Sequence, residues 1–233
     1  RSVTTADGES FEANWVISSM PITLLLKALP GVPDEVKGAA EQLRFRNTIL
    51  VYLLLDDDSL FPDQWLYIHD PSVKHGRITN FRNWSEQMVG DEAQTVLCLQ
   101  FWCFDEDAIW SQSDEKLVQQ ATDELVSVGL AKKESVTAGT VVRIPRCYPV
   151  YERGYQRPLE VVTQYLDTIR GLVPIGRYGA FKYNNQDHSI LMGIMAAEGV
   201  ASDIEPSLWH INTDSTYQEG ANSATLATSH HEQ

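Results

Sequence analysis

Arginine and tyrosine side chains stand near the ends of several predicted strands, and they are the residues whose types could do chemistry. Arg77 lies ten residues after Tyr67, and Arg177 lies six residues before Tyr183. Tyr148 stands between them in a Cys-Tyr-Pro corner. Arginine offers a planar fork of N–H donors and tyrosine a hydroxyl, so a few such side chains can bind an anionic small ligand. The scattered carboxylates identify no acid–base pair.

Residues 176–199 form the stretch around which the chain is organised. A glycine corner and a polar segment lead into a predicted helix, in which apolar residues such as Ile190 and Ile194 recur at helical spacing. Asn185, Asp187 and Ser189 are all able to cap its start. A helix N-terminus attracts an anion or a developing negative charge. A capped core helix with no ligand explains the same spacing equally well.

Several kinds of site are excluded by the sequence. There is no G-x-G-x-x-G after a strand, no G-x-x-x-x-G-K-[ST] and no G-x-S-x-G. The three cysteines have no metal-type spacing, and the sequence predicts reduced, buried thiols and no metal site. A turn with three aspartates at residues 56–58 is interpreted as solvated.

The charge argues against a nucleic-acid surface, because 32 acidic residues face 18 basic ones and the net charge is −14. No apolar run reaches the length of a membrane-spanning helix, so we expect no transmembrane segment and a cytoplasmic location. The polar start of the chain lacks a methionine and resembles the middle of a hairpin, which suggests a fragment.

The order of predicted elements indicates an α/β fold combined with an α+β insertion. Strands near residues 15–18 and 172–175 are expected to lie together, with an antiparallel sheet between them in the chain. Asp7-Gly8 predicts a turn in a first hairpin. Further strands are predicted at 44–56, 64–68, 76–84, 95–104 and 140–144, and the nearly continuous apolar residues of the first predict that both its faces are buried. Ser113 is predicted to cap a helix at 113–128. The predicted divisions are a first segment at 1–30, an inserted domain at 31–155, a return segment at 156–201 and a polar tail at 202–233. We expect the tail to pack little.

Aromatic residues are dense in the predicted insertion, where they include Tyr67, Phe81, Trp84, Phe101, Trp102, Phe104 and Trp110. Most are expected in a core. An aromatic wall over a flat ligand is the alternative.

Together, these motifs resemble the UDP-galactopyranose mutases, particularly the eukaryotic type, within the flavin amine oxidase and protoporphyrinogen oxidase superfamily. The resemblance is carried by W-L-Y at 65–67, R-x-T-x-F-x-N-W-S at 77–85, the Y-P-x-[aromatic or P] corner at 148–151, G-R at 176–177 and N-Q-D-H-S at 185–189. It covers roughly residues 1–200. It implies the C-terminal part of a two-domain, Rossmann-like, FAD-binding flavoenzyme with an inserted antiparallel-sheet substrate domain. Residues 1–30 and 156–201 would then be segments of the FAD domain, and residues 31–155 the substrate-binding domain.

The resemblance also implies roles for individual residues. A substrate diphosphate would be bound by Tyr67, Arg77, Tyr148, Arg177, Tyr183 and Asn185. A flavin would be bound by Gly176, Gln186, Asp187, His188 and Ser189. No side chain is expected to be catalytic, because the flavin supplies the bond chemistry. The segment between Tyr183 and Asn185 is shorter than in the eukaryotic enzymes.

Three functions follow as hypotheses. The first is an FAD-dependent mutase that interconverts the pyranose and furanose forms of UDP-galactose through reduced flavin, with NAD(P)H as one source of electrons. The second is an FAD-dependent oxidoreductase of the amine oxidase or protoporphyrinogen oxidase type. The third is an inactive orphan domain. The expected substrate is a UDP-sugar. Because the dinucleotide fingerprint is absent, the other expected partner is a missing N-terminal FAD-binding half. Without that half, FAD is expected to bind poorly.

Overall fold

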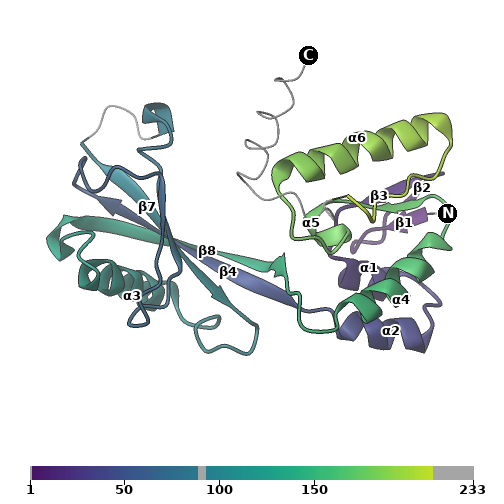
Figure 1. Cartoon of the computed structure of the whole chain (residues 1–233), viewed down its shortest axis with the longest axis horizontal. Helices are drawn as coiled ribbons and strands as arrows, with labels where there is room; N and C mark the ends of the chain where they lie inside the picture. The colour runs from purple at the N-terminus through teal and green to yellow at the C-terminus, as the bar shows by residue number, and fades with distance from the viewer. Residues whose placement is uncertain (1, 89–92, 212–233) are drawn as a thin grey trace, which may run out of the picture. The chain divides into compact units, whose positions relative to one another are not determined.

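The computed structural model describes residues 2–88 and 93–211 of the 233 (Figure 1). The chain divides into two compact units. Residues 45–147 form one, here called the sheet unit. The flanking residues, described over 2–44 and 148–211, form the other, here called the terminal unit.

A five-stranded antiparallel sheet forms the sheet unit, in the spatial order β5-β6-β7-β4-β8. One long helix and two short 3-10 turns accompany it. The elements are β4 (Phe45–Leu55), β5 (Trp65–Tyr67), β6 (Arg77–Asn80), η1 (Glu86–Met88), β7 (Thr95–Cys103), α3 (Asp114–Ser127), η2 (Lys133–Ser135) and β8 (Val136–Pro149).

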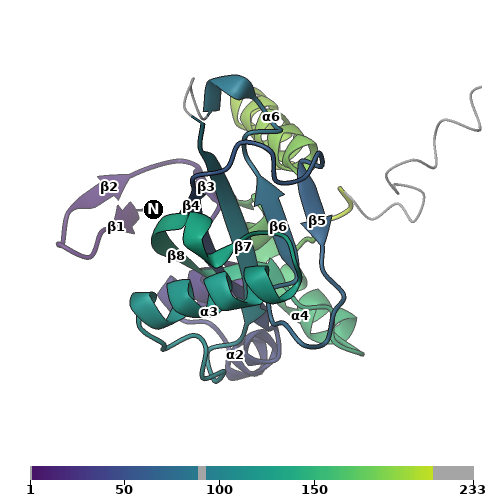
Figure 2. The same cartoon turned by 90° about the vertical axis from the view of Figure 1, so that its left-hand side faces the viewer.

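The core of the sheet unit lies between the sheet and α3, which crosses one sheet face (Figure 2). Alternate residues of β4 and β7, such as Ile49 and Leu99, are completely buried there against Leu117 and Leu125 of α3. We expected both faces of β4 to be buried, but from Ile49 onward only alternate residues are fully buried, on the face that packs against α3. The residues of the other face, Leu50, Tyr52 and Leu54, are half-buried. The Ser113 hydroxyl accepts a bond from the Lys116 amide, which confirms the predicted cap of α3.

Two strands differ from their predicted lengths. The strand predicted at 76–84 ends at Asn80, whose side-chain oxygen accepts a bond from the Arg82 amide and turns the chain. The strand predicted at 140–144 extends over fourteen residues. It passes through Pro145 because β8 is an edge strand, where a missing N–H is tolerated.

A largely buried hydrogen bond between Glu124 and His75 fixes the loop before β6 to α3. The Glu124 carboxylate lies 2.7 Å from His75 Nδ1 and also accepts bonds from the amides of Lys74 and His75. Its other oxygen accepts a 2.6 Å bond from Gln120. Burial alone would raise the pKa of Glu124, but these bonds outweigh it and lower the pKa from 4.5 to about 2.

Replacing Glu124 by glutamine is expected to reduce the free energy of unfolding by up to about 3 kcal/mol at neutral pH. A depressed carboxyl pKa stabilises the fold fully above pH 4.5, and this contribution is lost as the pH falls towards 2. The difference between the native protein and E124Q should therefore shrink over that window in urea unfolding. A pH-independent difference would contradict this assignment.

The terminal unit contains two small sheets and five helices in its described part. β1 (Ser2–Thr4) and β2 (Ser10–Glu12) form an exposed hairpin, with its turn at the predicted Asp7-Gly8. β3 (Val16–Ser18) and β9 (Leu172–Pro174) pair in parallel, as expected of the terminal pieces. The helices are α1 (Ile22–Ala28), α2 (Asp34–Glu41), α4 (Gln156–Asp167), α5 (Gly176–Gly179) and α6 (Gln186–Ser202).

The segment after α6 packs more closely than we expected. Leu208 and Ile211 are buried in one cluster with Val173 of β9 and Met192 of α6. The Trp209 indole donates a 2.7 Å bond to Asp167. The expectation of little packing is therefore wrong for residues 208–211. Leu208, Trp209 and Ile211, the large apolar residues of this segment, pack against β9 and α6. The rest of the predicted tail, residues 212–233, lies outside the described residues.

The compact units begin and end at different residues from the predicted domains. Helix α2 and residues 148–155, which we expected in the substrate domain, belong to the terminal unit. In that unit α2 packs against α4. None of the helices in the described ranges is long and apolar enough to cross a membrane.

Candidate functional site

The parallel strand pair of the terminal unit places the glycine corner. Its register ends with Ser18 opposite Pro174, and the Ile175 amide then bonds to the Ser18 carbonyl. Gly176 has a φ of +75°, which lets the chain turn at once into α5. Gly179 lies so close to β3 that a Cβ atom would stand 2.7 Å from the Ser18 carbonyl oxygen. The contact fixes the short helix that carries Arg177.

Arg177, Tyr148 and Tyr183 form the centre of the site, here called the arginine–tyrosine cluster. The guanidinium carbon of Arg177 lies 5.1 Å from each of the two ring centroids. The rings themselves are stacked, 5.4 Å apart. Such contacts are cation–π interactions, which hold the charged group without consuming its N–H donors. All three residues are among those that the motifs assign to a substrate diphosphate.

The guanidinium keeps donors for a ligand. Its Nη2 atom donates to the Asn184 carbonyl, which uses one or two of its five N–H groups. Tyr183 is 55% exposed, so the cluster is open to solvent. A half-buried guanidinium beside two tyrosine rings can bind a phosphate or carboxylate through charge-assisted bonds.

Asn185 takes a different place from the neighbouring Asn184. It is the N-cap residue of α6 by position, yet its side chain makes no capping bond and it is exposed. Asn184 is buried, and its amide donates to the Ser189 hydroxyl. The capping bond that Asn185 could make is therefore absent, and the buried amide of the loop is that of Asn184.

The residues predicted to bind a flavin lie at the corner and in the first turn of α6. Gly176 precedes Arg177, and the segment Gln186 to Ser189 opens the helix. Nearby, Ser18 Oγ and Asn184 Oδ1 are buried with no hydrogen-bond partner among the residues that the structure describes. An uncapped helix start and two unsatisfied polar atoms suit a polar cofactor edge. In this respect the residues present fit a flavin.

Tyr67 and Arg77 lie in the sheet unit, directly opposite each other on β5 and β6. Residues opposite each other on antiparallel strands point to the same sheet face, so the two form a pair. The Nε atom of Arg77 is buried and has no hydrogen-bond partner in the described ranges. The other four predicted diphosphate residues belong to the terminal unit.

The aromatic residues of the sheet unit divide between core and surface. Phe101 is buried in the core, and Trp110 packs against it. Trp65 and Trp84 instead stack at 5.4 Å and are both about half exposed, beside exposed Tyr67. The sheet unit therefore has aromatic residues in its core and, separately, an exposed aromatic pair that could contact a flat ligand.

Tyr151 is a residue near the cluster to which the sequence assigned no role. Its hydroxyl accepts a 2.7 Å bond from the Tyr183 amide and donates to the Phe181 carbonyl. The only sequence signal was its place as the aromatic residue of the Y-P-x-[aromatic or P] corner at 148–151, to which no role was assigned.

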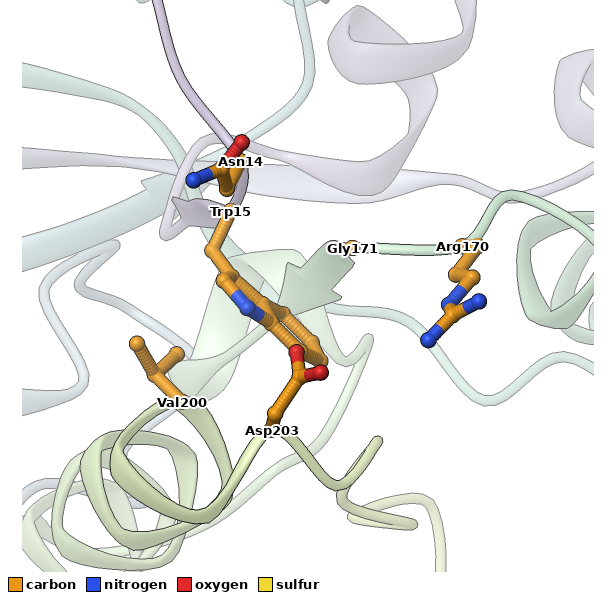
Figure 3. Close-up of a pocket in the computed structure, with 6 residues that line it drawn as sticks. All are labelled: Asn14, Trp15, Arg170, Gly171, Val200 and Asp203. Carbon is orange, nitrogen blue, oxygen red and sulfur yellow. The ribbon is translucent and has the colours of Figure 1, made fainter.

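A separate cavity of about 650 Å³ lies in the terminal unit (Figure 3). Trp15 and Arg170 extend into it, and Asp203 lies below the indole. Asn14 and Trp15 directly precede β3, and Gly171 directly precedes β9, so the cavity lies at the amino ends of the strands. Ligands of parallel sheets bind at the carboxyl ends, where the predicted residues are. The cavity holds none of them.

Comparison with solved structures gives the fold. The structure of a reduced UDP-galactopyranose mutase matches with a TM-score of 0.78 and 24% identity, over 89% of this chain and 45% of that one. A candidate protoporphyrinogen oxidase from Exiguobacterium matches with a TM-score of 0.59 and 20% identity, over 76% and 39%. A Pyrococcus furiosus protein matches at 0.53 and 12%, over 90% and 46%.

These matches show the fold of part of a two-domain flavoenzyme, and the predicted fold class is confirmed. The chain spans less than half the length of the structures it matches. No family model matches the sequence, and no curated protein does.

Replacing Gly179 by alanine is expected to reduce stability by about 1–3 kcal/mol, because the new methyl group would collide with the Ser18 backbone. Gly193→Ala in α6 is the matched control. Its methyl group would meet nothing within 4 Å, and alanine favours a helix by up to about 1 kcal/mol. Urea unfolding of both variants checks the contrast, which equal destabilisation would contradict.

Proposed function

We propose that this chain is part of an FAD-dependent sugar-nucleotide mutase that interconverts UDP-galactopyranose and UDP-galactofuranose. The arginine–tyrosine cluster is the observation that carries the proposal. Three residues that the motifs assign to the diphosphate, from two separate segments, lie in mutual contact. The match to a reduced UDP-galactopyranose mutase adds support at the level of the fold.

A diphosphate suits the chemistry of both units. Arg177 offers a fork of donors, and the buried Nε of Arg77 needs an acceptor that the described residues do not provide. A buried donor without a partner costs about 1–3 kcal/mol, which a ligand oxygen would recover. The motifs assign Tyr67 and Arg77 of the sheet unit, and Tyr148, Arg177, Tyr183 and Asn185 of the terminal unit, to diphosphate binding, and the proposal keeps these roles.

FAD is the proposed cofactor. Gly176, Gln186, Asp187, His188 and Ser189 would hold its ring and ribityl chain, and reduced flavin would supply the bond chemistry at the sugar. The seventeen-residue helix α6 directs the positive end of its dipole towards its N-terminus. That end would stabilise the negative charge of a reduced flavin.

A further FAD-binding half is the proposed partner. Ile190, Leu191 and Ile194 of α6 are 62%, 46% and 51% exposed. The β3–β9 pair is a parallel sheet of only two strands, whereas parallel sheets are normally larger and covered on both faces. Additional strands and helices from an FAD-binding half would cover these surfaces.

An FAD-dependent oxidoreductase is the second candidate. The exposed stack of Trp65 and Trp84, beside Tyr67, favours it because a flat substrate could lie on the indole rings. Substrate oxidation with formation of hydrogen peroxide would distinguish it from the mutase.

Replacing Arg177 by alanine is expected to weaken UDP binding by about tenfold to a hundredfold, because charge-assisted bonds to the diphosphate are lost. Arg153→Ala removes the same charge from an exposed position outside the cluster and should leave affinity unchanged. NMR titration with UDP measures both. Equal affinity of R177A and the native chain would refute the diphosphate role.

Turnover tests the mutase reaction itself. The protein expressed from its complete reading frame, loaded with FAD and reduced, is expected to convert UDP-galactofuranose into UDP-galactopyranose, as measured by chromatography. The same protein with oxidised FAD is the control and should be inactive. Bound, reduced FAD without conversion would eliminate the mutase.

A further inference from the structure

We propose that Tyr151 is a positioning residue, whose hydroxyl holds the loop between α5 and α6 so that Arg177 and Tyr183 form an anion site. The inference rests on the proposed function only for the identity of the anion. Tyr151 touches no predicted ligand and would act through Tyr183.

The hydroxyl of Tyr151 bridges two backbone groups of this loop. It accepts a 2.7 Å bond from the Tyr183 amide and donates a 3.4 Å bond to the Phe181 carbonyl. Phe181 is fully buried and has a φ of +51°, which is unfavourable for a phenylalanine. A strained residue persists only where its surroundings hold it, so the hydroxyl stabilises a backbone conformation that would otherwise relax.

The ring of Tyr151 is fixed independently of its hydroxyl. It stacks on Tyr155 at 4.3 Å with only 5° between the planes, and it also contacts Phe181. Removing the hydroxyl alone would leave these contacts in place. The packing and hydrogen-bonding roles of Tyr151 are therefore experimentally separable.

The loop transmits its position to the arginine. The Arg177 carbonyl accepts a 2.9 Å bond from the Lys182 amide, and its guanidinium donates to the Asn184 carbonyl. The Tyr183 ring lies between these anchors in sequence and contacts the guanidinium. If residues 181–183 shift, the ring and the donors of Arg177 shift with them.

The pKa of Tyr151 is compatible with a hydroxyl that bridges two backbone groups. Burial, the largest influence, raises its pKa above the ordinary value of 10, and the bond from the Tyr183 amide only partly offsets this. The phenol therefore stays neutral at physiological pH. A neutral hydroxyl can accept and donate at once, as the bridge requires.

Tyr151→Phe in the 233-residue chain tests the proposal, with Tyr155→Phe as the matched control. The Tyr155 ring stacks in the same way, but its hydroxyl has no hydrogen bond within the described part of the chain. We expect Y151F to weaken UDP binding in an NMR titration by about three- to tenfold, the effect of one lost hydrogen bond, and Y155F to leave it unchanged.

Two readouts need no ligand. In the native chain the two tyrosine rings should shift the Arg177 Nε–H resonance, identified by its absence in Arg177→Lys. The Tyr183 amide should exchange slowly with solvent. In Y151F the resonance should move towards its unstructured position and the amide should exchange faster, whereas Y155F should match the native chain in both.

These experiments distinguish the diphosphate assignment from the positioning role of Tyr151. If the native chain does not bind UDP, the diphosphate assignment fails, and the resonance and exchange data alone decide on Tyr151. Unchanged resonance and exchange in Y151F would overturn the positioning role, as would a change of equal size in Y155F. Should Y151F fail to fold, slow Tyr183 exchange in the native chain supports the bridge and fast exchange refutes it.

Discussion

The parallel pairing of β3 with β9 is the contact on which the terminal unit depends. It joins Val16–Ser18 to Leu172–Pro174, across more than 150 residues of intervening chain. Its register places the end of β3 beside the start of α5, where Gly179 meets the Ser18 backbone. A shift by one residue would move every β9 side chain to the other face, and Val173 would leave the core. The position of Arg177 therefore follows from strand register before any side chain of the cluster contributes.

An anion site is compatible with a chain of net charge −14 because electrostatic interactions are local. At physiological salt, charges more than about 8 Å apart are largely screened. The Arg177 guanidinium contacts two neutral rings and a backbone carbonyl, and no carboxylate of the described residues pairs with it. By contrast, Arg143 is paired with Asp114 and fixes α3 to β8. What distinguishes a binding arginine from a structural one is its immediate partners, which net charge does not reveal.

Sequence patterns predicted the elements whose causes are local. The apolar runs of β4 and β7, the Asp7-Gly8 turn and the Ser113 cap depend on neighbouring residues, and all of them are present. Features that depend on distant contacts were missed. Pro145 within β8 is tolerated only because that strand lies at the sheet edge, and Leu208 is buried only because α6 and β9 offer a surface.

The residues of the candidate site also divide into those that the sequence motifs supplied and those that they missed. The motifs supplied Tyr148, Arg177 and Tyr183, and the structure brings these three together. Asn184 and Tyr151 were missed, since one differs from its neighbour only in the direction of its side chain and the other acts across thirty residues through its hydroxyl.

Helix α6 is apolar on several sides, and the terminal unit covers only some of them. Met192 and Ala196 are buried within the terminal unit, yet Ile190, Leu191 and Ile194 on other sides of the helix are exposed. A helix that is apolar on all sides is normally enclosed by protein. Burying these three side chains would yield several kcal/mol, enough to drive docking of further protein. The same helix presents its N-terminus to the predicted flavin site, so docking and cofactor binding would stabilise one another. Under the proposed function, FAD would contact both the terminal unit and a further FAD-binding half, and it would bind tightly only when both are present, because half a site leaves much of a ligand's surface in water.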